Sequence, residues 1–316
     1  AVGGDCLSSE LEIHCGGVGV NTSLALARLQ VLVRLLGATG RDWFGEFALR
    51  GLQAERVDVS FVQRRQDAVT GMVFIAVNPD GQRTIFGSRG ANEMASLPPD
   101  TRGCWEGIEG LHLVGYSFLS PFGEKSARRL LEEARRFGAW VSLDVGDAPS
   151  RQVPRAILQA AREVDILIAA CDEAAALTGQ RDAQSAFTAL EESGARRVVV
   201  KLGGEGCLFR EDGALRNAPG FPVQATDTTG AGDVFTATLL RARLREWPWP
   251  EGAIVANAAG GLAATVVGAG ESIPAAAGIL ELLQTSRLPG EWDAVRRRAL
   301  ERLTRELRVT DSAASR

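Results

Sequence analysis

The sequence predicts an α/β fold in which a mostly parallel sheet is covered by helices on both faces and carries a small β lid. Two observations lead to this prediction. Apolar runs of strand length alternate with segments of helical period from about residue 31 to about residue 283, the pattern of parallel strands joined by crossover helices. The apolar runs are nearly continuous, so both faces of the sheet are expected to be buried.

The elements follow from this alternation in chain order. Strands are expected at apolar runs bounded by glycine, polar residues or helical segments, namely Val33–Gly37, Leu111–Val114, Trp140–Asp144, Ile166–Ala169 and Arg197–Leu202. Crossover helices are expected where apolar residues recur at helical spacing or small residues dominate, at Phe44–Ala54, Glu124–Arg136, Ser185–Glu192 and Gly252–Val267.

Residues Thr70–Gly87 have a different pattern. An apolar strand, Gly71–Val77, meets Asn78-Pro79-Asp80-Gly81, and Gln82–Phe86 returns. Pro followed by Asp-Gly between two extended runs predicts a β-hairpin. The hairpin either covers a ligand crevice or is an edge hairpin without a ligand role.

The C-terminal part changes character after Pro289. Glu291–Leu307 is a charged, arginine-rich helical stretch followed by a polar tail. We predict one α/β domain over residues 1–283 and a helical extension with a tail over residues 284–316. A solvated helix is expected, with anion binding or subunit contact as the alternatives.

Composition excludes several classes of function. The chain has 316 residues with 35 basic and 39 acidic side chains, a net charge of −4. Nucleic acid and anionic membranes are bound by clustered positive charge, so neither partner is expected. With two histidines, the chain has little material for a histidine metal site or a Ser-His-Asp triad.

Location and redox state are inferred in the same way. The five cysteines are widely spaced and include no Cys-x-x-Cys pair, which predicts reduced thiols. The chain opens with no signal segment and contains no long uninterrupted apolar run. A cytoplasmic protein is therefore expected. Nearly all basic side chains are arginines, and lysine occurs only at Lys125 and Lys201. The position of Lys201 in the fold is therefore of interest.

Two glycine-rich stretches are candidate ligand sites. Gly16-Gly17-Val18-Gly19-Val20-Asn21 precedes a helical segment, Ser23–Leu29, and glycines there permit close approach of a ligand. The spacing resembles a dinucleotide fingerprint. No buried strand precedes it, however, because Leu11–Cys15 alternates like a half-exposed strand, so a dinucleotide site is not expected.

The second stretch, Asp227-Thr228-Thr229-Gly230-Ala231-Gly232-Asp233, runs directly into the helical Thr236–Leu244. Gly230 to Gly232 would leave backbone N–H groups at a helix N-terminus, where negative charge on a phosphate is stabilised. Asp233 either takes a proton from a substrate hydroxyl or only caps the helix.

Together the two stretches resemble the paired signatures of the PfkB, or ribokinase-like, carbohydrate kinases. The resemblance extends to about Pro274 and includes three further matches in order: Gly37–Gly45, then Thr70-Gly71 with Arg89-Gly90-Ala91-Asn92, and Lys201-Leu202-Gly203-Gly204-Glu205-Gly206. It implies a ribokinase-like three-layer sandwich with a β lid from about 8–16 and 69–92. The implied activity is ATP-dependent phosphotransfer to a hydroxyl of a sugar or sugar-like molecule.

The resemblance also implies roles for individual residues. Asp233 would be the catalytic base, with Gly230, Ala231 and Gly232 as the anion hole. Gly16, Gly17, Asn21, Arg89 and Asn92 would contact the sugar, and Lys201, Gly203, Gly204, Gly206 and Asn257 would contact the nucleotide. Glu173 would organise Mg²⁺ through water, and a monovalent cation such as K⁺ would lie near Asp227, Thr229, Val266, Gly268 and Ser272. Lids of this family often pair, which implies a homodimer.

Two departures from the family pattern bear on activity. The family carries Asn-x-x-Glu at the end of a central strand, whereas this chain has Ala170-Cys171-Asp172-Glu173. Only fifteen residues precede Gly16. Because an unpaired slot would remain beside buried strands, we expect about twenty to thirty residues, with a strand and an aspartate, upstream of Ala1.

Two alternative functions follow. A nucleoside kinase of the same family would share the ribose moiety, and Phe86 is a candidate stacking residue for it. A non-catalytic sugar- or nucleotide-binding member is favoured by the missing Asn and first strand, and opposed by the intact Gly230-Ala231-Gly232-Asp233. The identity of the sugar is not predicted. If Arg89 reaches the pocket, a sugar acid is favoured; the alternative is that Arg89 is a solvent-facing loop residue or pairs with a nearby acid such as Glu93.

Overall fold

The computed structural model describes residues 12–77 and 83–314. Its centre is a six-stranded sheet in the order β10-β9-β8-β7-β6-β5. Strands β5 to β8 are parallel, and β9 and β10 add an antiparallel edge. The bounds are β5 Gly110–Val114, β6 Trp140–Asp144, β7 Ile166–Ala170, β8 Val198–Lys201, β9 Cys207–Glu211 and β10 Ala214–Ala218.

Four predicted strands are therefore confirmed within one or two residues at each end. The fifth, at Val33–Gly37, is displaced: β1 spans Gly37–Gly40 and pairs in parallel with β2, Val62–Arg65, in a separate two-stranded sheet. Upstream of β1, the backbone pairing of Arg34 with Asp58 is an isolated parallel β-bridge and not part of a strand.

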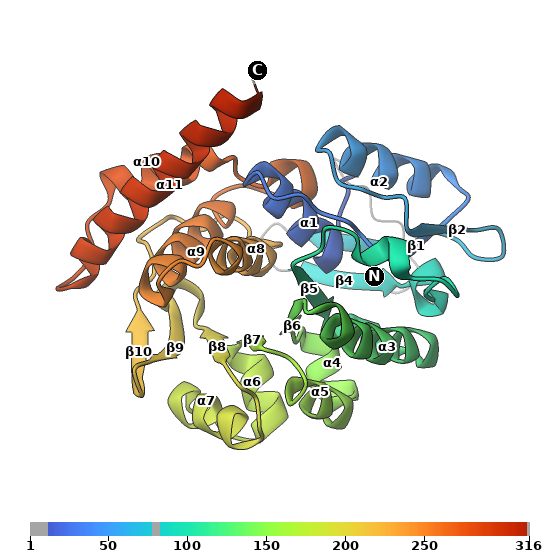
Figure 1. Ribbon diagram of the computed structural model, residues 1–316, viewed down its shortest axis with the longest axis horizontal. Coiled ribbons are helices and arrows are strands. Elements are labelled where there is room, and N and C mark those ends of the chain that lie inside the picture. The colour runs from blue at the N-terminus through green and yellow to red at the C-terminus, as the bar shows by residue number, and fades with distance from the viewer. Residues whose placement is uncertain (1–11, 78–82, 315–316) are drawn as a thin grey trace, which may run out of the picture.

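Helices form a layer on each face of the central sheet (Figure 1). One layer contains α3 to α7 and the other contains α1, α8 and α9. Alternate strand residues pack into the two layers: Leu143 and Leu167 face the first, whereas Ile166 and Ile168 face the second. Both faces of the sheet are thus buried, which confirms the predicted three-layer class.

The helix bounds follow the predicted segments closely. The first layer contains α3 Pro121–Phe137, α4 Asp147–Gln152, α5 Pro154–Ala161, α6 Cys171–Thr178 and α7 Ala183–Glu192. The second contains α1 Val18–Arg28, α8 Ala231–Leu244 and α9 Trp249–Ala263, with α10 Ala276–Thr285 and α11 Trp292–Ala314 outside α9; α2 Trp43–Ala54 lies beside β1 and β2. Helix α1 begins at Val18, earlier than predicted, so Asn21 lies inside the helix.

The predicted solvated C-terminal helix is wrong for one face of α11. Val295, Ala299 and Leu303 are buried and join the same apolar cluster as α1, α8 and α9. Glu251 of α9, also buried, receives ion pairs from α11 at Arg298 and Arg302. The charged composition of α11 hid this apolar stripe. The part of the chain before residue 284 and α11 therefore share one core.

The predicted hairpin is confirmed as β3, Met72–Val77, paired with antiparallel β4, Arg83–Ser88. Its turn lies outside the described residues. The predicted lid also included residues 8–16, of which 8–11 lie outside the described residues and 12–16 form no strand. The hairpin buries little of its own apolar surface, because Val73, Phe74 and Phe86 are all more than half exposed.

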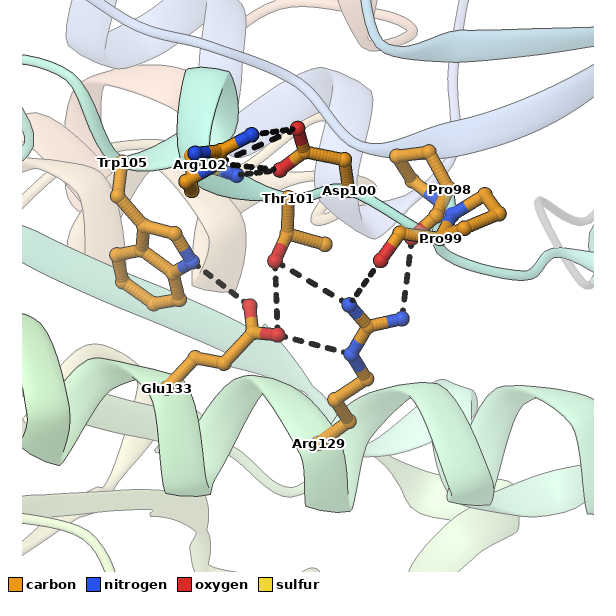
Figure 2. A network of polar contacts seen from close by, with 8 residues as sticks. All are labelled: Pro98, Pro99, Asp100, Thr101, Arg102, Trp105, Arg129 and Glu133. Atoms are coloured by element: carbon orange, nitrogen blue, oxygen red, sulfur yellow. Dashed lines mark hydrogen bonds and ion pairs between the residues drawn. The ribbon is translucent and has the colours of Figure 1, made fainter.

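The chain after the hairpin is held on α3 by a polar network (Figure 2). Glu133 accepts hydrogen bonds from Trp105 Nε1, Thr101 Oγ1 and Arg129 Nε, each at 2.8 Å. Arg129 also donates to the carbonyl oxygens of Pro98 and Pro99. This network fixes the segment that connects the lid to β5.

The described part of the chain contains no helix that is both long enough and apolar enough to cross a lipid bilayer.

Candidate active site

The second glycine-rich stretch forms the N-terminus of α8. Gly230 is the N-cap residue with a left-handed backbone (φ 76°), a conformation that glycine adopts without strain, and the helix continues through Gly232 and Asp233. The first backbone N–H groups of a helix have no intrahelical partners and carry partial positive charge. The predicted nest therefore lies at a helix N-terminus.

The structure joins the two glycine-rich stretches through one hydrogen bond. Asn21 Nδ2 donates to Asp233 Oδ2 at 2.7 Å, although the two residues are 212 positions apart. Asn21 is 4% exposed, and its Oδ1 has no hydrogen-bond partner among the described residues. Gly16 and Gly17 precede α1 with open space where a side chain would lie. The N-termini of α1 and α8 thus meet at one place.

The pKa of Asp233 is raised well above that of an ordinary aspartate. Burial raises its pKa to about 7, the hydrogen bond from Asn21 and the charge of Lys201 lower it, and the carboxylates of Asp144 and Glu173 raise it further. A base works best when its pKa is near the working pH. An aspartate that acted only as a helix cap would gain a lowered pKa from its hydrogen bonds and the positive end of the helix.

Lys201 lies at the centre of this charge cluster. Its Nζ is 3.0 Å from both carboxylate oxygens of Asp144, and Thr236 Oγ1 donates to the same carboxylate at 2.6 Å. Neither Asp144 nor Thr236 was predicted from the sequence as a site residue. A polar residue that ends a buried parallel strand, as Asp144 ends β6, was the available signal, because ligands of such sheets bind at that edge.

Glu173 occupies the first turn of α6. Its Oε2 accepts a hydrogen bond from the backbone N–H of Ala170 at 2.7 Å. Burial raises its pKa and the charge of Lys201 lowers it. Since residue 170 is alanine, the hydrogen bond to Glu173 from this position comes from the backbone N–H and not from a side-chain amide. Among the described residues, no three His, Cys, Asp or Glu side chains gather closely enough to hold a metal.

The predicted nucleotide loop connects β8 to β9. It contains a 3₁₀ turn, Gly203–Glu205, closed by a hydrogen bond from Leu202 N–H to Gly206 O at 2.8 Å. Gly204 has open space at its side-chain position. Two predicted nucleotide contacts are engaged elsewhere: Lys201 pairs with Asp144, and Asn257 is buried and donates to the carbonyl oxygens of Ala218 and Pro219.

Three of the five residues predicted for a monovalent cation are joined by hydrogen bonds. Asp227 accepts hydrogen bonds from Thr229 N–H, Thr229 Oγ1 and Gly268 N–H. Ser272 Oγ lies 3.6 Å from the position of a Cβ added at Gly268, and Val266 is 37% exposed. The segments containing residues 227 and 268 are therefore held together.

Of the residues predicted to contact the sugar from the lid, Asn92 is engaged in a structural hydrogen bond, and the Arg89 side chain makes no such bond within the described residues. Asn92 Oδ1 accepts a hydrogen bond from the backbone N–H of Ala38, so this side chain holds the base of the lid against β1. Arg89 is partly buried, and burial lowers its pKa while the nearby Glu93 and Tyr116 raise it. Tyr116 in turn is within electrostatic range of Glu173 and Asp233. Tyr116 is thus within electrostatic range of both Arg89 and Asp233.

Comparison with known proteins identifies the family. A family model described as pfkB family carbohydrate kinase matches residues 4–276. The chain belongs to the pfkB family of carbohydrate kinases. The predicted family, fold class and carbohydrate-kinase function are confirmed.

Relatives of this pfkB kinase carry the names of kinases for different sugars. It is 30% identical to fructokinase-1 of Oryza sativa subsp. japonica, over 86% of this chain and 88% of that protein. It is also 30% identical to 2-dehydro-3-deoxygluconokinase of Escherichia coli (strain K12), over 77% of this chain and 87% of that protein. The structure of ribokinase from Thermotoga maritima matches with a TM-score of 0.76 at 26% identity, covering 90% of this chain and 93% of that one.

Proposed function

We propose that this pfkB kinase transfers the γ-phosphoryl group of ATP to a hydroxyl of a sugar or sugar-like molecule, with Asp233 as the general base. The contact between Asn21 and Asp233 at the N-terminus of α8 is the observation on which the proposal depends. Asn21 orients the carboxylate, and burial gives it a pKa suited to accept the hydroxyl proton.

The chemistry follows from this arrangement. Asp233 takes the proton as the hydroxyl oxygen attacks the γ-phosphorus, and ADP leaves in line. Gly230, Ala231 and Gly232 direct the positive end of α8 at the charge on the transferring group. Gly16 and Gly17, with Asn21, hold the acceptor sugar beside the base.

The nucleotide is assigned to the loop after β8. Gly203, Gly204 and Gly206 allow its phosphates close to the backbone, and Asn257 supports the loop by fixing residues 218 and 219. Mg²⁺ fits a site that is only partly made of protein: Glu173 is the acidic side chain there, so phosphate oxygens and water would complete the coordination. The bound ion would neutralise phosphate charge.

The segments around Asp227 and Gly268 fit a K⁺ site better than a Mg²⁺ site. The Asp227 carboxylate already accepts three hydrogen bonds, so backbone carbonyl groups near Thr229, Val266, Gly268 and Ser272 would supply the ligands. Free thiols at Cys104, Cys171 and Cys207 are consistent with a cytoplasmic location.

The experiment that tests the function is a coupled ATP-consumption assay over pentoses, hexoses, sugar acids and nucleosides. Turnover on sugars or sugar acids supports the proposal. Turnover confined to nucleosides would replace it with a nucleoside kinase. Nucleotide or sugar binding without turnover on any acceptor would make this chain a non-catalytic member.

We expect a sugar acid to be preferred over its neutral analogue. Arg89 is partly buried and within electrostatic range of Tyr116, which is in turn within range of Asp233, and a substrate carboxylate bound beside its guanidinium would gain a charge-assisted, two-point contact. One relative at 30% identity is by name a kinase of such an acid, 2-dehydro-3-deoxygluconate.

Arg89→Ala should therefore lower kcat/KM on the acid by about tenfold to a hundredfold, and on the neutral analogue by less than about threefold. Parallel kinetics on the two substrates measure this difference. Arg102→Ala is the control, since Arg102 is exposed and pairs only with the neighbouring Asp100 in the described structure. Equal losses on both substrates would place Arg89 outside recognition.

We also propose that two copies pair through their lids. The β3–β4 sheet has two strands, and exposed apolar side chains lie along it: Met72, Val73, Phe74, Ile75 and Phe86. One face can cover the substrate, and a second copy's lid would bury the other, since an exposed apolar patch of this kind is costly in water.

Phe74→Glu is expected to convert the dimer to a monomer, measured by sedimentation velocity. Phe122→Glu on α3 is the matched control, because Phe74 and Phe122 are each 57% exposed. A wild-type monomer at tens of micromolar, or equal effects of the two substitutions, would contradict pairing through the lid.

A further inference from the structure

Lys201 does not reach toward the nucleotide loop. It ends β8, its side chain is 14% exposed, and its Nζ lies 3.0 Å from both oxygens of Asp144, which is 6% exposed. The same Nζ is 3.5 Å from the position of a Cβ added at Gly232. The ammonium group therefore lies against the backbone of the anion hole.

The ion pair spans the sheet. Asp144 ends β6 and Lys201 ends β8, with β7 between them, so the two side chains together bridge about two strand spacings, roughly 10 Å. In β7, Ile168 pairs with Asp144 and the small Ala170 pairs with Lys201. Both ends of the pair lie on the sheet face that α8 covers.

Helix α8 is tied to this pair. Thr236 Oγ1 donates to Asp144 Oδ2 at 2.6 Å, and Thr236 is fully buried. Residues three apart lie on one side of a helix, so Thr236 is on the same side of α8 as Asp233. One carboxylate thus holds both the ammonium group under Gly232 and the turn that follows the base.

We propose that Lys201, held by Asp144 and Thr236, is a positioning residue that supports the anion hole and sets the height of α8 relative to the substrate. This inference rests on the proposed role of Asp233. In this role Lys201 helps to stabilise the transition state of phosphoryl transfer and does not bind ATP in the ground state.

The charges in the cluster agree with this role. Burial lowers the pKa of Lys201, but the carboxylates of Asp144, Glu173 and Asp233 outweigh burial and raise it above its ordinary value. Lys201 therefore stays protonated, whereas burial of the imidazole lowers the pKa of the nearby His112 to about 4, so His112 stays neutral. The groups that face Asp233 are Asn21, Tyr116, Asp144, Glu173 and Lys201.

Lys201→Met is the first test, because it removes the charge and keeps most of the stem. We expect kcat to fall about tenfold to a hundredfold while KM for ATP changes less than about threefold. The acid limb of kcat/KM should move to higher pH, since Lys201 lowers the pKa of Asp233. Lys125→Met is the control; it changes the other lysine, exposed on α3.

Thr236 supplies the second test, which leaves every charge in place. Thr236→Val should lower kcat about threefold to tenfold without moving the acid limb, and Thr236→Ser, which keeps the hydroxyl, should restore kcat. This pair decides the question if Lys201→Met does not fold.

Two outcomes would overturn the inference. A rise in KM for ATP with kcat unchanged in Lys201→Met would make Lys201 a nucleotide ligand. Equal kcat for Thr236→Val and wild type would show that the tie to α8 has no role. Neither result removes Asp233 as the base, which is tested separately by Asp233→Asn.

Discussion

Asp233→Asn is expected to lower kcat by about a thousandfold or more while the protein stays folded and still binds ATP. Asparagine keeps the shape of the side chain but cannot accept the proton of the substrate hydroxyl. The Asn21 amide would also face an amide in place of a carboxylate at 2.7 Å. Single-turnover kinetics and an ATP-binding isotherm on the same sample measure the two effects.

Stability provides the control for this variant. Because the pKa of Asp233 is raised from 3.8 to about 7 in the folded state, its ionisation opposes folding. This group's contribution to stability is therefore present below about pH 4 and is lost as the pH rises through about 7. Asn does not titrate, so Asp233→Asn should raise the melting temperature at pH 8 by a few degrees and not at pH 4.

Turnover within about threefold of wild type would remove the general-base role. A lower melting temperature at pH 8 would instead show that the carboxylate is a stabilising helix cap. The two measurements therefore separate the chemical role of Asp233 from the structural one.

Gly206→Ala should destabilise the protein by about 3 kcal/mol or more, a fall in melting temperature of roughly 5–10 °C. Gly206 has φ 98° and ψ −128°, a backbone conformation that alanine strains to adopt. An added Cβ would lie 1.9 Å from Ala218 O and 2.6 Å from Gly220 N. Both are backbone atoms, so neither can move aside without shifting β10 and the segment after it.

Gly204→Ala is the matched control in the same loop. A Cβ there meets nothing within 4 Å, and its φ is not in the left-handed region. Its melting temperature should equal that of wild type, and any effect should appear in KM for ATP. Thermal unfolding of both variants tests the prediction, and equal stability would mean that the loop between β8 and β9 adjusts freely.

Local patterns predicted much of the fold. The helix α3 shows why: Ser120 caps its N-terminus, Pro121 occupies its first position, and its apolar residues recur at helical spacing up to Gly138. Each of these signals lies within the element itself. The buried parallel strands were likewise visible as apolar runs, because a strand covered on both faces has no polar alternation to obscure it.

The antiparallel edge was less visible. Strands β9 and β10 contain Arg210 and Arg216, which face neighbours at the rim of the sheet, so their pattern lacks a clean apolar run. The stripe on α11 that packs into the core was hidden for a related reason, since arginines surround it. In both cases, segments from distant parts of the chain pack on an element whose local sequence pattern is polar, so its buried face is not visible from the sequence.

By itself, the sequence determined the fold class, the family and the residue types at the ends of α1 and α8, because each is recorded in short runs of neighbouring residues. Only the tertiary structure decided which of those residues act on one another. It joined Asn21 to Asp233, turned Lys201 away from its loop to Asp144, and brought Thr236 to the same carboxylate. The reason is physical: these pairs are 212, 57 and 92 positions apart, so the order and spacing of the packed strands and helices, which no local pattern contains, set their distances.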